Sequence, residues 1–200
     1  MTWRVLALVT AVVAWWLAPP PQAFGEAKLT VTKLAEKKVA QLPAGPLFWR
    51  LETFATKTAA ERAAGAFSLV AESGGKAWLF TLGPAGEASS PGGTKVAEVG
   101  PLRPVVAPEY VLRINEASGP PGSITSVHSH PGSEVFYVLA GEQSIRSASG
   151  VVRVMPGKPE ARGGADMAMQ VSSTGTTDLH ALVMFVVDAT KPFSSPATFR

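Results

Sequence analysis

The chain has no cysteine and only three histidines among its 200 residues. Without cysteine no disulfide can form, so the core alone must hold the fold, and attachment to a membrane through a lipid-modified cysteine is excluded. Charged residues make up only 16% of the chain, and the formal net charge is +3. Its one basic cluster, Lys33, Lys37 and Lys38, is typical of a solvated stretch, so we expect no nucleic-acid partner.

The N-terminus carries a long apolar run without charges. Arg4 precedes the continuous apolar segment 5–18, and three prolines and several small residues follow it. This pattern predicts a cleaved secretory signal peptide over residues 1–25. Cleavage after Gly25 and cleavage after Ala27 both satisfy the requirement for small residues.

The apolar run is too short for an easy membrane crossing. The alternative to cleavage is an uncleaved anchor, in which Trp15 and Trp16 would suit the membrane interface. Export of a chain without cysteine indicates the bacterial periplasm or the outside of the cell. We therefore expect an exported protein with no stable membrane insertion after cleavage.

Glycine and proline are abundant, with 19 and 17 residues, and they separate many short apolar runs. This composition favours short strands joined by turns. Residues 26–41 fit a linker or a short edge strand. Alternation and turn signals predict strands at 47–55, 67–72, 76–82, 110–115, 134–140, 143–147, 151–155, 167–172 and 180–188, and a short helix at 58–65.

Metal-binding chemistry is concentrated in the stretch 122–141, which reads GSITSVHSHPGSEVFYVLAG. His128 and His130 point to the same face of a strand because side chains alternate with a period of two. After a turn, Glu134 opens the next apolar run, and we expect it to lie opposite the histidines across a hairpin. Imidazole and carboxylate are ligands of divalent cations, so one cation can bridge the two neighbouring strands.

The spacing of Gly122, His128, His130, Glu134 and Gly141 resembles the first motif of the cupin superfamily at every fixed position. The resemblance implies an all-β fold: a cupin-type jelly-roll β-barrel with a metal site inside, extra N-terminal strands and one short helix. The expected division is 1–25 signal peptide, 26–99 N-terminal extension with strands packing on the barrel, 100–192 cupin barrel and 193–200 C-terminal tail. No histidine precedes residue 128, which excludes a second copy of the metal motif.

The second motif of the family is degenerate here, because Met169 stands where the fourth metal ligand, a histidine, is usual. Three alternatives follow. The site can consist of two His and one Glu with open positions, as oxygen-using iron sites require, or Met169 can add a thioether, which favours copper. In the third alternative, Met169 is a core residue and the barrel binds metal weakly. His180, at a strand end, and Glu160, in a loop, are weaker candidates.

The neighbouring strands suggest what surrounds the metal. Phe136 and Val138 share the parity of Glu134 and should face inward, whereas Tyr137 should face outward. Arg113 and Asn115 on the preceding strand either orient a polar or anionic substrate or belong to an exposed strand face.

A site of this kind would hold a divalent transition metal, Fe, Mn, Cu, Ni or Zn, next to a small-molecule ligand in an apolar barrel. The first hypothesis is a metal-dependent small-molecule enzyme, dioxygenase-like or related. The second is a small-molecule or metal-binding cupin module without turnover, and the third is a purely structural barrel. The family resemblance also makes a homodimer an expectation, since exposed barrel edges often pair in cupins.

Overall fold

The structure is a computed structural model that describes residues 27–199, so the predicted signal peptide at residues 1–25 lies outside the described residues. In this part of the chain, no helix is both long and apolar enough to span a membrane. The elements are β1 (Thr30–Val39), β2 (Phe48–Phe54), α1 (Lys57–Ala63), β3 (Ser68–Ser73), β4 (Lys76–Gly83), β5 (Thr94–Val99), β6 (Tyr110–Gly119), β7 (His128–Ser129), β8 (Gly132–Ala140), β9 (Gln143–Ser147), β10 (Gly150–Val154), β11 (Glu160–Arg162), β12 (Met169–Ser173), β13 (Leu179–Asp188) and β14 (Ser195–Pro196).

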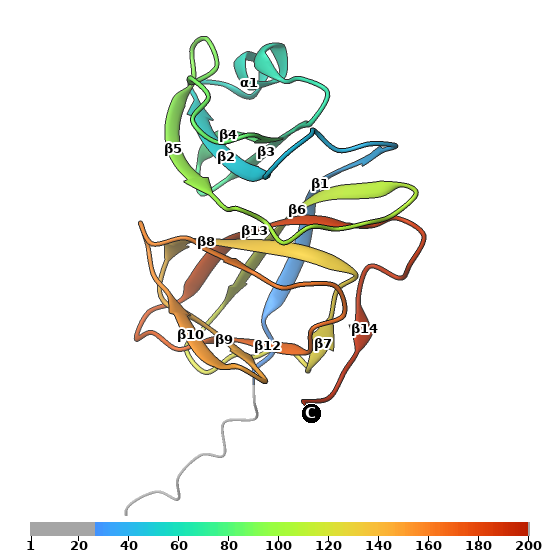
Figure 1. Ribbon diagram of the computed structural model, residues 1–200. Helices are drawn as coiled ribbons and strands as arrows, with labels where there is room; N and C mark the ends of the chain where they lie inside the picture. The colour runs from blue at the N-terminus through green and yellow to red at the C-terminus, as the bar shows by residue number, and fades with distance from the viewer. Residues whose placement is uncertain (1–26, 200) are drawn as a thin grey trace, which may run out of the picture.

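These strands form three sheets, which confirms the expected all-β fold with one short helix. The first sheet has the order β1-β6-β13-β8-β11 and is called the central sheet below. A second sheet, β10-β9-β12-β7-β14, faces it and completes the barrel in the lower half of Figure 1. The third, the small sheet, has the order β3-β4-β2-β5 and lies with α1 above the central sheet.

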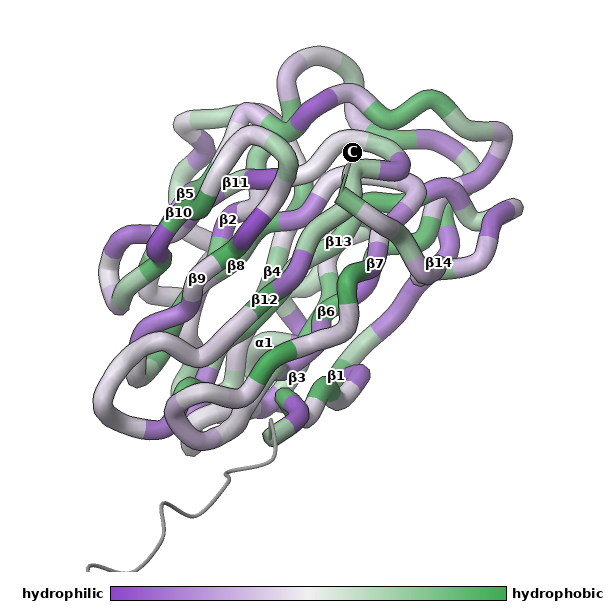
Figure 2. The backbone as a smooth tube through the Cα atoms, turned by 90° about the horizontal axis from the view of Figure 1, so that it is seen from below, coloured by the Kyte–Doolittle hydropathy of each residue, from purple (hydrophilic) through white to green (hydrophobic). Residues whose placement is uncertain are grey.

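The central sheet is buried on both faces, as its middle strand β13 shows. Val183, Phe185 and Val187 belong to the apolar cluster inside the barrel. The alternate residues Leu182 and Met184 belong to a second cluster, which the central sheet shares with the small sheet. Since side chains alternate along a strand, a nearly continuous apolar sequence is what a strand covered on both sides requires. Figure 2 shows hydropathy along the whole tube, with hydrophobic stretches in the strands.

The small sheet confirms most of the elements expected before the motif. The predicted strand at 47–55 is β2, and the predicted strands at 67–72 and 76–82 are β3 and β4. These two pair as a hairpin whose turn places Gly74 and Gly75 at positive φ. Strand β5 was not predicted: charged and small residues in the sequence TKVAEV leave little apolar alternation.

The helix begins earlier than the sequence suggested. Its N-cap is Thr56, whose side-chain oxygen accepts a hydrogen bond from the backbone N–H of Ala59 at 3.1 Å. Thr58 therefore lies inside the helix and is not its cap. The last turn closes at Ala64 in an extended conformation, so Gly65 does not provide a left-handed C-terminal cap.

Segment 26–41, expected as a linker or a short edge strand, supplies the ten-residue strand β1 at one edge of the central sheet. The C-terminal segment also contributes a strand, because β14 pairs with β7 in the second sheet. The division of the chain at residues 99 and 100 stays a prediction. The structure adds that the barrel includes β1 from before this boundary and β14 from the expected tail.

The backbone conformation explains why glycine stands at both ends of the motif. Gly122 and Gly141 both adopt positive φ, at 84° and 74°, which side-chain-bearing residues rarely do. At Gly141, a Cβ atom would also lie 2.6 Å from the carbonyl oxygen of Asp178. Alanine at this position would therefore force the backbone between β8 and β9 to move.

Candidate metal centre and ligand cavity

A cavity of about 290 Å³ lies inside the barrel and brings His128, His130 and Glu134 together as lining residues. The histidines and the carboxylate reach it from different sheets: β7 belongs to the second sheet and β8 to the central sheet. The predicted hairpin between them is therefore wrong. The chain crosses from one sheet to the other near Pro131. Strand β7 pairs with β12 and β14, and strand β8 pairs with β11 and β13.

His130 is held as a neutral ligand would be. Its ring is 6% exposed and packs 4.9 Å from the ring of Phe185 and 4.7 Å from that of Phe193, measured between centroids. Burial lowers the pKa of His130 to about 4, so the imidazole is neutral near pH 7. Its Nδ1 lies 2.5 Å from the carbonyl oxygen of Phe193. A carbonyl can only accept, so Nδ1 carries the proton and Nε2 keeps its lone pair.

His128 is oriented in the same way. Its Nδ1 lies 2.8 Å from the carbonyl oxygen of Ser126, so this ring also donates through Nδ1 and leaves the lone pair of a neutral ring on Nε2. The two imidazoles contact each other edge to face, with 5.0 Å between ring centroids. Histidines that bind metals commonly donate their other ring N–H to a carbonyl or carboxylate, which fixes tautomer and orientation.

Glu134 is 2% exposed on β8, and burial raises the pKa of this carboxyl to about 8. Arg162 is its directly opposed neighbour in the β8–β11 ladder, but the Arg162 guanidinium lies 2.9 Å from Glu160. Among residues 27–199, no basic side chain forms an ion pair with Glu134. A cation in the cavity would supply the missing countercharge and favour the ionised carboxylate.

The three donors share a cavity without surrounding one point. Over the described range, no group of three or more His, Asp or Glu side chains is close enough to hold a metal ion. The chemistry of the donor set nevertheless fits a divalent transition metal: two imidazoles whose Nε2 atoms form no hydrogen bond within residues 27–199, and one carboxyl without a countercharge.

Met169 lies next to the predicted metal ligand His128, as its place in the degenerate motif suggests. In the β7–β12 ladder it is directly opposite His128, and its side chain is 2% exposed within the apolar cluster inside the barrel. It does not belong to the residues that line the cavity. This packing favours the core alternative, and the role of Met169 as a ligand stays a prediction.

The remaining candidates lie elsewhere. His180 is outside the cavity, where its Nε2 lies 3.0 Å from Ser73 Oγ and 2.9 Å from Glu116 Oε2. Glu160 belongs to β11 and contacts Arg162. Arg113 does not line the cavity: it forms an ion pair with Glu36, and its guanidinium carbon lies 3.6 Å from the centre of the Phe193 ring.

Inward-facing side chains follow the predicted parity. Phe136 lines the cavity and Val138 packs in the cluster inside the barrel, whereas Tyr137 points to the small sheet and contacts Trp78. Asn115 lines the cavity and is 5% exposed, so it does not belong to an exposed strand face.

Gln143 and Phe193 are among the lining residues that sequence reasoning missed. Gln143 had a detectable signal, because it shares the parity of the inward-facing Ile145 on a predicted strand and is therefore a polar residue on an apolar face. Phe193 had none beyond being an aromatic residue in a Pro- and Ser-rich tail.

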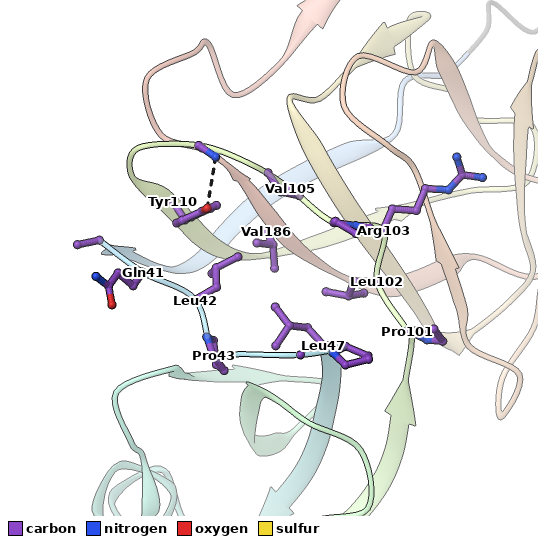
Figure 3. A pocket seen from close by; sticks show the side chains of 15 residues that line it. Gln41, Leu42, Pro43, Leu47, Pro101, Leu102, Arg103, Val105, Tyr110 and Val186 are labelled. Atoms are coloured by element: carbon purple, nitrogen blue, oxygen red, sulfur yellow. Dashed lines mark hydrogen bonds between the residues drawn. The ribbon is translucent and has the colours of Figure 1, made fainter.

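A larger cavity of about 780 Å³ lies between the segments that connect the small sheet to the barrel (Figure 3). Its labelled side chains are mostly apolar, among them Leu42, Leu47 and Leu102, and the hydroxyl of Tyr110 accepts a hydrogen bond from the Ala107 N–H. None of its lining residues is His, Asp or Glu. Size alone would favour this cavity, but convergent acid, base or ligand groups mark a functional site, and those lie in the smaller one.

No protein-family model matches the chain, and no curated protein matches it by sequence. Several solved structures resemble part of the chain. A cupin superfamily protein from Desulfitobacterium hafniense is 18% identical over 38% of this chain and 68% of that protein, with a TM-score of 0.35. A DMSP lyase from Ruegeria pomeroyi is 22% identical over 43% of each chain, with a TM-score of 0.37, so this chain spans less than half of the lyase. A cupin-like protein from Thermotoga maritima is 13% identical over 44% of this chain and 65% of that protein, with a TM-score of 0.39.

Because these TM-scores lie below 0.5, we assign the fold from features of the chain itself. Two antiparallel sheets face each other, the first motif is complete, and its two histidines and its glutamate line one cavity between the sheets. The part of the chain that these sheets contain has the fold of a cupin.

Proposed function

We propose that this chain binds a divalent transition metal through His128, His130 and Glu134 and acts on a small organic molecule as a metal-dependent enzyme, dioxygenase-like or related. The observation that carries the proposal is the state of the two imidazoles. Backbone carbonyls hold both Nδ1 atoms, so Nε2 is the atom that each ring can offer to a metal, beside a buried carboxyl that lacks a countercharge.

The metal, when bound, would act as a Lewis acid or lower the pKa of a bound water. The residues of the chain have separate roles. Phe136, Phe185 and Phe193 form apolar walls that limit the access of water to the site. The carbonyls of Ser126 and Phe193 keep the two imidazoles in one tautomer. Fe, Mn, Cu, Ni and Zn all accept this donor set, so the metal is to be identified by measurement.

Metal analysis of the purified protein tests this proposal. The wild type and the variants His128→Ala, His130→Ala and Glu134→Gln are compared by elemental analysis after exposure to each candidate metal. His180→Gln is the matched control, because His180 lies outside the cavity and contacts Ser73 and Glu116. We expect one metal ion per chain in the wild type and in the control, and a clear loss in the three cavity variants. Equal metal content in all five proteins would refute the site.

The second candidate function is a binding module without turnover. It is favoured by the donors not being gathered around one point and by the buried Met169 in place of a fourth histidine ligand. A ligand that binds the metal-loaded protein but yields no product under oxygen would support the module. Measurable turnover that disappears in His130→Ala would support the enzyme.

We also propose that the protein is exported to the periplasm or the outside of the cell. The support is the sequence of residues 1–25 and the lack of cysteine. Fractionation of cells that express the full chain, together with N-terminal sequencing of the mature protein, tests this. Mature protein that begins after Gly25 or Ala27 is the expected result, and an intact N-terminus in the cytosolic fraction would contradict it.

A further inference from the structure

The walls of the barrel cavity contain polar atoms without partners. Gln143, on β9, is completely buried, and neither its Oε1 nor its Nε2 forms a hydrogen bond with any group of residues 27–199. The same holds for Oδ1 of Asn115, on β6, a side chain that is 5% exposed. Buried amides of folded proteins almost always have partners, so two unpaired amides in one cavity require an explanation.

The two amides face the cavity from opposite sides. Gln143 belongs to the second sheet and Asn115 to the central sheet, and both line the space that the three predicted metal ligands share. A molecule in this space can therefore accept a hydrogen bond from the Gln143 Nε2 and donate hydrogen bonds to the amide oxygens of both residues. A hydroxyl group can do both, since it donates one hydrogen bond and accepts others.

Charge narrows the class of ligand. No lysine or arginine is among the cavity-lining residues that the structure describes. Arg113 is not among the lining residues either: its guanidinium is paired with Glu36 and its guanidinium carbon lies 3.6 Å from the centre of the Phe193 ring. A phosphate or carboxylate in the cavity would therefore find its only countercharge on the bound metal, whose charge the Glu134 carboxylate already reduces, whereas a neutral ligand requires no further countercharge.

Size and wall chemistry narrow it further. At about 290 Å³, the cavity is at the lower end of ligand cavities, which run from about 300 to 1,000 Å³. Three phenylalanines, Phe136, Phe185 and Phe193, supply faces and edges against which one ring can pack. The space fits a single ring with its substituents and excludes a nucleotide or an oligosaccharide.

We infer that the cavity takes a neutral molecule of one ring that carries hydroxyl groups, and that Gln143 and Asn115 recognise those hydroxyls. This inference rests on the proposed function, because the ligand would occupy the cavity of the metal site. Gln143 and Asn115 would then discriminate between ligands, while the histidines and Glu134 hold the metal.

Resorcinol is a suitable probe, because its two hydroxyls are placed too far apart on the ring to chelate one metal ion. Its binding to the metal-loaded wild type is measured by calorimetry, beside 1,3-dimethoxybenzene, which cannot donate a hydrogen bond, and 3-hydroxybenzoate, which is an anion. We expect resorcinol to bind more tightly than either. The variants are Gln143→Met and Asn115→Leu. The matched control is Gln170→Met, because Gln170 is not a lining residue and its Nε2 already donates to the Thr125 carbonyl.

Loss of one such hydrogen bond should weaken resorcinol binding roughly tenfold in Gln143→Met, with no change in Gln170→Met. Equal binding by the wild type and Gln143→Met would overturn the inference, as would dimethoxybenzene or hydroxybenzoate binding as tightly as resorcinol, or no resorcinol binding by the wild type. Metal content is measured on the same samples. Because Gln143→Met keeps all three predicted ligands, loss of resorcinol binding with full metal content concerns this inference alone. An absence of metal in the wild type concerns the proposed function.

Discussion

The polar groups on the two faces of the central sheet differ in whether they have hydrogen-bond partners. On the outer face, towards the small sheet, Ser73, Glu116 and His180 satisfy one another: Ser73 Oγ lies 2.5 Å from Glu116 Oε2 and 3.0 Å from His180 Nε2. On the inner face, towards the cavity, Asn115 and Glu134 have no such partners within the described residues. The Nε1 of Trp49 is the exception on the outer side, since it is buried without a partner.

The polar groups on the outer face stabilise the fold, whereas those on the inner face are available to a ligand or a metal. Partnered polar groups and close apolar packing stabilise the union of barrel and small sheet. Unpaired buried groups reduce the stability of the protein alone, and their cost is recovered only when a ligand or a metal pairs with them. Substitutions on the outer face should therefore lower the free energy of unfolding and leave binding unchanged. Substitutions of the unpaired inner groups should weaken binding without lowering the free energy of unfolding.

Trp78→Ala should give the largest effect and should act on stability alone. The indole is 1% exposed, stacks on Phe80 and contacts Tyr137, each at 6.0 Å between ring centroids. Removing a buried tryptophan typically lowers the free energy of unfolding by about 3–5 kcal/mol. Urea unfolding measures it, with Val106→Ala, a side chain that is 93% exposed, as a control expected to change by less than about 0.5 kcal/mol. If the folded Trp78→Ala protein lost its metal, the two faces would not be independent.

Glu116→Gln should give the next largest effect and a change in pH dependence. Burial alone would raise the pKa of Glu116, but the hydrogen bonds from Ser73 and His180 outweigh it and hold the pKa below its ordinary value of 4.5. A carboxyl with a lowered pKa stabilises the folded state above the pKa of the unfolded chain, and this contribution is lost as the pH falls through the folded value.

We therefore expect Glu116→Gln to be about 2 kcal/mol less stable than the wild type at pH 7. As the pH falls from 5 to 3, the free energy of unfolding should decrease less in Glu116→Gln than in the wild type. Urea unfolding across this pH range measures both effects. Glu109→Gln is the control, because the Glu109 carboxylate forms an exposed pair with Lys38 that should contribute less than about 1 kcal/mol. Parallel stability curves for wild type and Glu116→Gln would contradict the role of the cluster.

Local sequence predicted the face of each side chain better than the partner of each strand. The period of two along β8 correctly placed Phe136 and Val138 inside the barrel and Tyr137 outside it. The motif also marked Gly141 by its spacing, and the structure shows that this position has a positive φ and no room for a Cβ atom. These features depend on residues that are close in the chain.

The strand partners of β7 and β8 could not be predicted from the local sequence. The sequence between His130 and Glu134 is compatible with a hairpin turn and with a crossing between sheets, and strand partners elsewhere in the chain decide between them. For the same reason, His180 looked like a simple strand-end residue, although its contacts come from Ser73, 107 residues earlier. Phe193 reaches the cavity only because β14 pairs with β7.

Met169→Leu tests the role of Met169, a residue of the second sheet inside the barrel that is either a metal ligand or a core residue. If Met169 is core, leucine conserves most of its volume, and the free energy of unfolding should fall by less than about 1.5 kcal/mol. Metal content should then equal that of the wild type, which elemental analysis checks. A drop in bound copper with unchanged stability would instead make the thioether a ligand.

Gln143→Met should give the smallest change, and its sign matters more than its size. Methionine has a similar length and no amide, so it removes two buried groups that have no partner in the described chain, and we expect a gain of roughly 0.5–1 kcal/mol in the metal- and ligand-free protein. Ser73→Ala provides the matched contrast on the outer face, because it removes a hydroxyl that is bonded to Glu116 and His180, and it should lower stability by about 1 kcal/mol. Urea unfolding of both variants in the same buffer measures the pair. A loss of stability in Gln143→Met as large as that in Ser73→Ala would mean that Gln143 is an ordinary structural residue, and the contrast between the barrel cavity and the outer face of the central sheet would then be wrong.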